Sequence, residues 1–167
     1  MRTITMIVVL VAALAASASA QPALQTGSRA PDFGLKDQFD KSWTLSALTG
    51  TVTVLVAADT DSGRAMGPWV DALKQKYAGK AQILGLLDLH TVPGIGRGIA
   101  RSRIRRETKD PLMLDFSGNI GRAYGVSSKA PTVVVIDKTG VVRAIARSAY
   151  DQTAFSDVAT AVDRALK

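Results

Sequence analysis

The chain has 167 residues, of which 47% are hydrophobic and 21% are charged, and its formal net charge is +7. This hydrophobic content excludes an intrinsically disordered chain, and the length supports one compact domain. The sequence contains no cysteine and a single histidine, His90. It therefore excludes disulfides, thiolate nucleophiles, iron–sulfur clusters and any metal site with several histidine ligands.

The first 20 residues have the three parts of a secretory signal peptide. Arg2 supplies a positive charge, residues 6–16 form an unbroken apolar run, and residues 18–20 read Ala-Ser-Ala, a small-residue cleavage pattern. The run is shorter than the ~20 apolar residues that span a bilayer, which favours cleavage over a membrane anchor. We therefore expect an exported protein, periplasmic or secreted, with one domain over residues 21–167 and no transmembrane anchor after processing.

The excess of basic residues is a second compositional feature. A moderate positive charge contributes to solubility, and it also favours an anionic neighbour such as a membrane surface or an acidic protein. Because exported proteins rarely meet nucleic acid, we expect no nucleic-acid partner.

The first half of the domain predicts a strand pair followed by a strand–helix–strand unit. Residues 32–37 and 42–45 predict two short strands around a turn. Residues 51–58 are an unbroken apolar, β-branched run, typical of a strand buried on both faces beside a parallel neighbour. Apolar side chains then recur every three or four residues over 61–77, which predicts a helix, and residues 82–89 predict a second buried strand. Such a unit is right-handed.

The second half of the domain predicts helices around a β-hairpin. A helix begins near Pro93 and ends near residue 107, and a short strand over 111–115 follows. After a brief helix, residues 131–147 predict the hairpin, and residues 153–166 predict the last helix. This order of elements predicts an α/β sandwich with a mixed sheet.

Three segments carry motifs of a known family. The first segment, residues 27–33, reads GSRAPDF. The second, residues 35–48, contains a predicted strand, a turn and the start of Ser-Ala-Leu-Thr-Gly. The third, residues 123–140, contains AYGV, APT and VIDKTG. They resemble the opening, entry and signature motifs of the thioredoxin-like superfamily, in its peroxiredoxin and thiol-reductase branch. The resemblance spans residues 27–166 and implies a thioredoxin-like three-layer sandwich, with a mixed central sheet and helices on both faces. Residues 92–102 are similar to the YtfJ-type periplasmic proteins.

The chain departs from this family at the redox centre. The family's enzymes place a nucleophilic cysteine just after the strand that ends near Ala58, at the start of the following helix. This chain has Asp-Thr-Asp-Ser over residues 59–62, and no histidine precedes residue 90 to act as a base for the Ser62 hydroxyl. The sequence therefore excludes thiol–disulfide exchange and cysteine peroxidase chemistry, and we expect no cofactor.

The resemblance also implies a ligand-binding rim. By the motif match, Pro131 takes the family's cis-proline position, which would bring the backbone of Lys129 and Ala130 beside residues 59–62. In redox relatives that backbone holds the substrate chain, so here it could hold an extended peptide of a protein partner. The alternative is an inherited scaffold without a ligand. The predicted rim residues are Asp59, Thr60, Asp61, Ser62, Ala130 and Pro131.

Acidic side chains and the single histidine follow the two neighbouring parallel strands. Asp59 and Asp61 come after the first strand, and Asp88 and His90 come at the end of the second. Because α/β proteins bind ligands at this edge, the four side chains could hold a hard or borderline cation. The alternative is structural: Asp59 or Asp61 caps the following helix, and His90 is a solvated loop residue.

The densest basic run lies on the predicted helix near residues 97–106, which contain five arginines. Three of them recur every four residues and form one stripe, while Ile95, Ile99 and Ile104 supply the apolar side. Arginine binds carboxylates and phosphates through paired hydrogen bonds, which predicts an anionic ligand or partner. The alternatives are a solvated helix face or contact with anionic lipid. The predicted anion-binding residues are Arg97, Arg101 and Arg105.

Three functions remain open on the sequence alone. The favoured one is a non-redox binding or accessory module of the periplasm, because the scaffold motifs are present while the nucleophile is absent. The second is a metal-dependent or other cysteine-independent enzyme that uses Asp59, Asp61, Asp88 and His90. The third is an envelope assembly protein with residues 97–106 as its interface.

Overall fold

A computed structural model describes residues 24–167, so the predicted signal peptide over residues 1–20 lies outside the described residues. No helix within residues 24–167 has the length and hydropathy needed to cross a bilayer. The elements are β1 (Gly34–Lys36), β2 (Ser42–Thr44), η1 (Ser46–Leu48), β3 (Thr53–Asp59), η2 (Gly63–Ala65), α1 (Met66–Tyr77), β4 (Gln82–Asp88), η3 (Gly94–Gly96), α2 (Arg97–Glu107), β5 (Leu112–Asp115), α3 (Asn119–Ala123), β6 (Thr132–Ile136), β7 (Val142–Arg147) and α4 (Gln152–Leu166), where η marks a short 3-10 helix.

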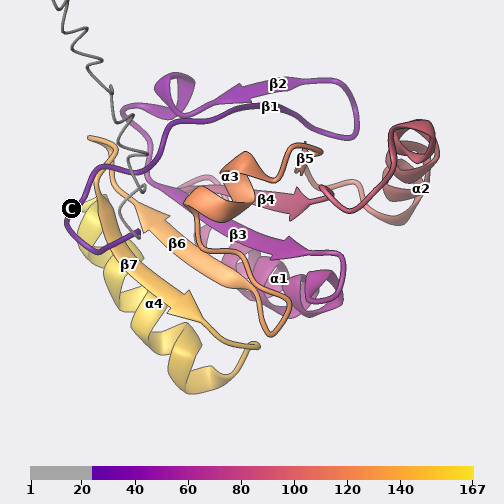
Figure 1. Cartoon of the computed structure of the whole chain (residues 1–167). Coiled ribbons are helices and arrows are strands. Elements are labelled where there is room, and N and C mark those ends of the chain that lie inside the picture. The colour runs from indigo at the N-terminus through magenta and orange to yellow at the C-terminus, as the bar shows by residue number, and fades with distance from the viewer. Residues whose placement is uncertain (1–23) are drawn as a thin grey trace, which may run out of the picture.

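The central sheet has five strands in the order β5-β4-β3-β6-β7. β3 and β5 each pair in parallel with β4, whereas β6 pairs antiparallel with both β3 and β7. β1 and β2 form a separate antiparallel hairpin that lies over one face of this sheet (Figure 1). The predicted α/β class and mixed sheet are confirmed.

Two hydrophobic cores lie on opposite faces of the sheet, as β3 illustrates. Leu55 and Ala57 point into the core beneath α3 and the β1–β2 hairpin. Val54 and Val56 point into the core beneath α1 and α4. Because helices cover both faces, the molecule is the three-layer sandwich that the family resemblance implies.

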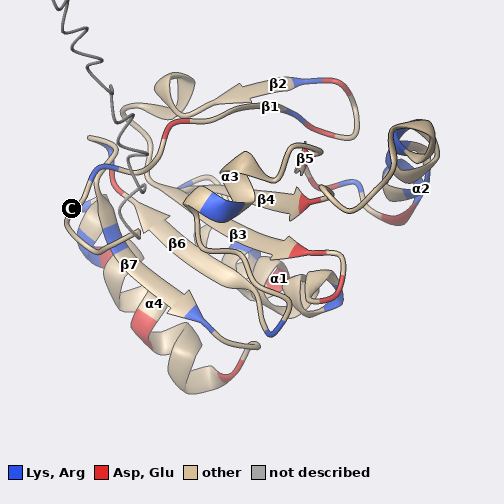
Figure 2. Ribbon diagram, viewed as in Figure 1, with Lys and Arg blue, Asp and Glu red and all other residues tan. Residues whose placement is uncertain are grey.

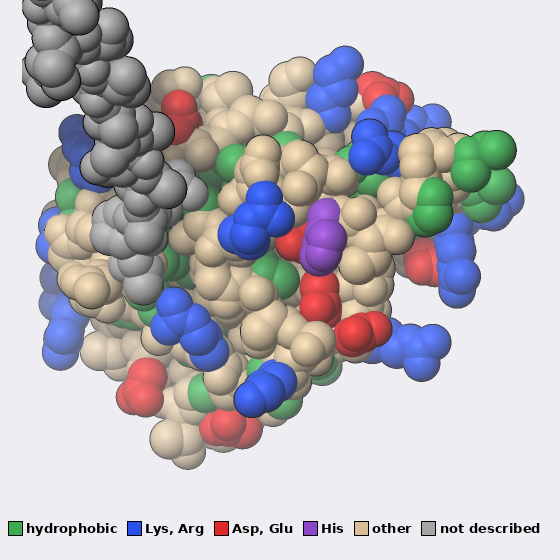
Figure 3. All heavy atoms as spheres, viewed as in Figure 1, with side chains coloured by type: hydrophobic (Ala, Val, Ile, Leu, Met, Phe, Trp, Pro, Cys, Tyr) green, Lys and Arg blue, Asp and Glu red, His purple; other side chains and the backbone are tan. Residues whose placement is uncertain are grey.

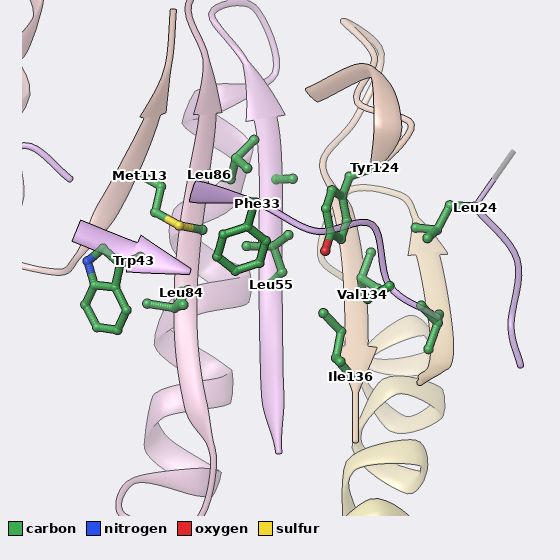
Figure 4. Close-up of a cluster of buried hydrophobic side chains, with 13 residues drawn as sticks. Leu24, Phe33, Trp43, Leu55, Leu84, Leu86, Met113, Tyr124, Val134 and Ile136 are labelled. Atoms are coloured by element: carbon green, nitrogen blue, oxygen red, sulfur yellow. The ribbon is translucent and has the colours of Figure 1, made fainter. Parts of the chain in front are cut away.

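The core beneath the hairpin includes a buried tyrosine with a fixed role. Trp43 and Met113 lie at the β5 side of this core, and Tyr124 lies towards β6 (Figure 4). The Tyr124 hydroxyl donates a hydrogen bond of 2.7 Å to the carbonyl oxygen of Pro31. Burial raises the pKa of Tyr124, so the side chain stays a neutral donor and ties the chain before β1 to the helix α3.

The turn between β1 and β2 is fixed to the edge of the main sheet by one buried side chain. The Gln38 amide nitrogen donates to the carbonyl oxygens of Thr108 and Asp110, at 3.3 Å and 2.7 Å. Its amide oxygen accepts from the backbone N–H of Leu112 at 2.9 Å. Gln38 therefore forms the hydrogen bonds that a neighbouring strand would otherwise form with these backbone groups at the edge strand β5.

The helix α2 lies at one end of the molecule, beyond the edge strand β5 (Figure 1). Ile104 is buried and packs with Leu89 and Leu114. Ile95 and Ile99 are 96% and 73% exposed, so the prediction of one shared apolar side is wrong. Ile99 and Ile104 are five residues apart, which places them on different faces of a helix.

Residues 24–167 contain no cis peptide bond, so the bond before Pro131 is trans. The predicted cis-proline is therefore wrong. Pro131 directly precedes β6 and is buried. The trans form is favoured at X–Pro bonds by about 0.5–1 kcal/mol, so a sequence motif alone does not fix the isomer.

Candidate functional site

Three aspartates stand side by side at the carboxyl ends of the parallel strands. Asp59 of β3 is the register partner of Asp88 of β4, which is in turn the register partner of Asp115 of β5. Figure 2 shows acidic residues at the ends of the β3 and β4 arrows. This edge of the sheet, where α/β proteins bind ligands, is the candidate site.

Asp59 organises the loop that follows β3. Its Oδ1 atom accepts hydrogen bonds from the backbone N–H groups of Asp61 at 3.0 Å and Ser62 at 2.9 Å. Burial by itself raises the pKa of Asp59, but the hydrogen bonds from the Ser62 N–H and hydroxyl outweigh it and leave the pKa lowered. Asp59 is therefore a fixed carboxylate that holds the turn before η2.

Ser62 connects this loop to a second one that is distant in the sequence. Its hydroxyl oxygen lies 2.8 Å from Asp59 Oδ1 and 3.0 Å from the carbonyl oxygen of Ser127, two acceptors that share one proton. The same oxygen accepts from the backbone N–H of Asp59 at 3.2 Å. Only 6% of Ser62 is exposed. The structure thus joins the loop of residues 59–62 to Ser127, whereas the resemblance implies that a cis-proline brings Lys129 and Ala130 to this loop.

The second loop presents unpaired backbone groups at the same edge. β6 begins at Thr132, the register partner of Ala57, so residues 127–131 lie level with the loop after β3. Ser127, Ser128 and Lys129 are exposed. Within the described chain, the backbone N–H groups of residues 127–130 donate no hydrogen bond to another backbone group. We call residues 59–62 and 127–131 together the rim.

His90 lies beside the rim and is oriented by Asp88. The His90 ring nitrogen Nδ1 is 2.8 Å from Asp88 Oδ1, which also accepts from the His90 backbone N–H at 3.0 Å. Two glycines make room for this pair: a Cβ on Gly121 would lie 2.3 Å from Asp88 Oδ2, and a Cβ on Gly118 would lie 2.8 Å from His90 Cβ. The ring itself is half exposed, as the purple side chain in Figure 3 shows.

The four predicted metal ligands do not come together in one cluster. No group of three or more His, Asp or Glu side chains in residues 24–167 is placed to hold a metal ion. Asp59 is directed to the turn at Ser62, and Asp88 is directed to His90, because each carboxylate caps the backbone of its own loop. Asp61 is exposed.

The predicted arginine stripe has mainly structural contacts. Arg101 and Arg105 both form ion pairs with Asp40 in the β1–β2 turn. Arg105 also donates from Nε to the carbonyl oxygen of Gln38 at 2.9 Å, and Arg97 donates to the carbonyl oxygen of Phe116 at 3.3 Å. The stripe therefore attaches α2 to the hairpin and to the chain after β5.

The sequence analysis did not identify Asp115, the third aspartate of the row. Asp115 is fully buried and accepts hydrogen bonds from the backbone N–H groups of Ser117, Gly118, Ile120 and Gly121 and from the Ser117 hydroxyl. Burial raises its pKa, but these hydrogen bonds outweigh the effect and lower it. An aspartate two residues before a serine, at the end of an apolar strand, is the signal of such a turn. Ser127 gives no comparable signal, since its contact with Ser62 depends on tertiary packing.

Comparisons with known proteins agree with this architecture. The model of the AhpC/TSA family matches residues 26–145, and no curated protein matches the chain. The chain is 24% identical to a proposed thiol:disulfide interchange protein, DsbE, from Chlorobium tepidum, over 87% of this chain and 100% of that one, with a TM-score of 0.66.

Two further solved structures share the fold. One is the exposed lipoprotein thioredoxin of Streptococcus pneumoniae, 20% identical over 80% of this chain and 99% of that one, with a TM-score of 0.63. The other is the peroxidoxin BcpB of Mycobacterium tuberculosis, 23% identical over 86% and 99%, with a TM-score of 0.61. Because the family match covers well over half of its length, the chain belongs to the AhpC/TSA family and has the thioredoxin-like fold without a cysteine.

Proposed function

We propose that the protein is an exported binding module that works without redox chemistry, and that its rim holds a segment of a partner protein. The observation that carries this proposal is the state of Ser62. It occupies the loop where the family's enzymes place their cysteine, yet its hydroxyl is buried between Asp59 and the carbonyl oxygen of Ser127.

The chemistry of this serine supports a structural use of the hydroxyl. A serine nucleophile needs a base that removes its proton. The only side chain that forms a hydrogen bond with the Ser62 hydroxyl in the described chain is Asp59, whose lowered pKa makes it a weak base at neutral pH. The hydroxyl therefore joins the two loops of the rim rather than attacking a substrate.

The backbone of the rim supports peptide binding. Extended peptides bind folded domains by pairing with unpaired backbone groups, and neighbouring side chains then give specificity. Within the described chain, the N–H groups of residues 127–130 donate to no other backbone group, and we propose that they pair with such a peptide. The exposed side chains of Asp61 and Lys129 provide one charge of each sign beside them.

Two observations support export. Residues 1–20 have the pattern of a signal peptide. One of the similar structures is described as an exposed lipoprotein thioredoxin. We accordingly place the proposed partner in the periplasm or outside the cell.

Site-specific photo-crosslinking in living cells tests the rim. A photoactivatable amino acid replaces Lys129, and a control protein carries it in place of Lys36, which is exposed on the hairpin. We expect one discrete adduct from position 129, none from position 36, and a weaker adduct from position 129 when Ser62→Ala disconnects the two loops. No adduct from position 129, or equal adducts from both positions, would contradict binding at the rim.

A further inference from the structure

The exposed hydrophobic side chains of the molecule gather at one end. Within residues 24–167, the large hydrophobic residues that are exposed are Phe39, Ile95 and Ile99. Ile95 lies on η3 and Ile99 on α2, while Phe39 lies in the β1–β2 turn beside Arg105 of α2, whose guanidinium is 5.7 Å from the ring centre. Figure 3 shows green side chains with blue neighbours at this projecting end.

Two arginines share the helix face of the exposed isoleucines. Arg103 and Arg106 follow Ile99 by four and seven residues, so all three lie on one face of α2. We call Ile95, Ile99, Arg103 and Arg106 the α2 patch. All four residues are exposed.

The α2 patch does not hold the helix in place. The opposite face of α2 is anchored by the buried side chain of Ile104, and its flank is anchored by the pairing of Arg101 and Arg105 with Asp40. Ile95 is almost fully exposed, and Ile99 keeps most of its surface exposed in the folded chain. Their exposure therefore has no explanation in the stability of the fold, and substitutions there leave the fold intact.

The charge around the patch is positive beyond what the protein itself balances. α2 contains five arginines and one glutamate. Arg103 pairs with Glu107 at 2.7 Å. In the described chain, neither Arg97 nor Arg106 forms an ion pair with a carboxylate. The exposed isoleucines thus lie on a helix with a net positive charge, and Arg106 of the patch has no carboxylate partner in the described chain.

We propose that the α2 patch docks on the surface of an anionic phospholipid membrane. A projecting helix with aliphatic side chains at its tip can insert them at the boundary between headgroups and acyl chains, while its arginines bind lipid phosphates. An acidic protein surface fits less well, because hot spots of protein interfaces are enriched in Trp and Tyr as well as Arg, and the patch contains arginines but neither of these aromatic residues. The α2 patch shares no residue with the rim, so either proposal can fail without the other.

Sedimentation with lipid vesicles tests the proposal. The wild-type protein is mixed with vesicles of equimolar phosphatidylglycerol and phosphatidylcholine, and with vesicles of phosphatidylcholine alone. We expect the protein to bind the anionic vesicles at least roughly tenfold more strongly than the phosphatidylcholine vesicles. This binding should weaken as salt is added. Ile95→Ser with Ile99→Ser, and separately Arg103→Gln with Arg106→Gln, should each weaken this binding by roughly tenfold or more.

A matched variant separates the patch from general positive charge. Lys36→Gln with Lys80→Gln removes two exposed charges outside the patch and should bind within about twofold of wild type. All variants share one N-terminus, so any contribution of the apolar run over residues 6–16 cancels. The proposal is overturned if the wild-type protein binds vesicles with phosphatidylglycerol no more strongly than vesicles of phosphatidylcholine alone. It is also overturned if the isoleucine variant binds the anionic vesicles as strongly as the wild type. It is also overturned if light scattering shows a dimer that only the isoleucine variant loses, which would assign the patch to a second copy of the chain.

Discussion

Aspartates at the strand ends of this protein bind the backbone of the turns that follow them. Asp137, after β6, repeats what Asp59 and Asp115 do: its Oδ1 accepts from the N–H groups of Thr139 at 2.8 Å and Val141 at 3.0 Å. A carboxylate is a stronger acceptor for such N–H groups than a neutral side chain. The row of acidic residues at the sheet edge is therefore explained by local turn formation.

Asp137 also makes stability depend on pH. Burial raises its pKa, but hydrogen bonds from Val141, Thr139 and Arg143 outweigh burial and lower the pKa to about 2. An unfolded chain has an aspartate pKa of about 3.9, so between these values the unfolded state binds the proton more readily. The stabilisation by Asp137 is thus complete above about pH 4 and is lost as the pH falls towards about 2.

We predict that Asp137→Asn weakens the dependence of the free energy of unfolding on pH below about pH 4. Urea unfolding at a series of pH values should show a wild-type free energy of unfolding that falls more steeply below about pH 4 than that of the variant, because the asparagine does not titrate. Parallel profiles would show that Asp137 has no lowered pKa in the folded state.

Gly121 offers a second prediction at the scale of single residues. Gly121→Ala places a methyl group 2.3 Å from Asp88 Oδ2 and should lower the free energy of unfolding by about 1–3 kcal/mol or more. Gly98→Ala is the matched control, because a Cβ at that helical position meets nothing within 4 Å. It should raise stability by about 0.5–1 kcal/mol. Thermal or urea unfolding of both variants checks the pair, and equal effects would contradict the close approach at Gly121.

At the scale of elements, the β1–β2 hairpin and α2 depend on contacts between distant parts of the chain. Gln38 connects the hairpin turn to the chain around β5, and Asp40 connects the same turn to α2. Asp40 has a φ of 68°, a left-handed conformation that aspartate tolerates better than most residues. The five-residue turn between β1 and β2 is therefore attached both to the edge of the sheet and to the helix that carries the α2 patch.

We predict that Gln38→Ala loosens this end of the molecule. The variant leaves the carbonyl oxygen of Asp110 and the N–H of Leu112 without their partner, which should cost about 1–3 kcal/mol in the free energy of unfolding. Hydrogen exchange at Leu112 should become faster as well. The exposed Gln75 on α1 gives the control, since Gln75→Ala should change stability by less than about 0.5 kcal/mol. Equal results for the two variants would contradict the anchoring role.

Most elements were predictable because their signals are local. The apolar run over 51–58 became β3, and the helical spacing over 61–77 became η2 and α1. The site was less predictable, because its key contacts join residues far apart in the chain, such as Ser62 and Ser127. The five-residue spacing places Ile99 and Ile104 on different faces of a helix, but it could not show which of the two faces is buried, since burial depends on what lies beside the helix.

At the scale of the whole molecule, two cores stabilise a sheet that has no disulfide. Strands β3 and β6 contribute side chains to both cores. One core lies under α1 and α4, and the other lies under the hairpin and α3. The rim lies at the carboxyl end of β3, and the α2 patch lies on η3 and on α2, the helix between β4 and β5 (Figure 1). The chain thus has the thioredoxin-like fold without the family's cysteine, and it presents two surfaces, the rim and the α2 patch, for which we propose binding roles.

The most direct test of a function without redox chemistry is an assay of the purified protein for the two activities of cysteine redoxins. We predict that the protein neither accelerates the reduction of insulin by dithiothreitol nor consumes hydrogen peroxide faster than buffer, because the Ser62 hydroxyl lacks both a thiol's chemistry and an activating base. A thioredoxin and a peroxiredoxin serve as positive controls. Turnover that scales with protein concentration, persists through repeated purification and disappears in Ser62→Ala would contradict the account.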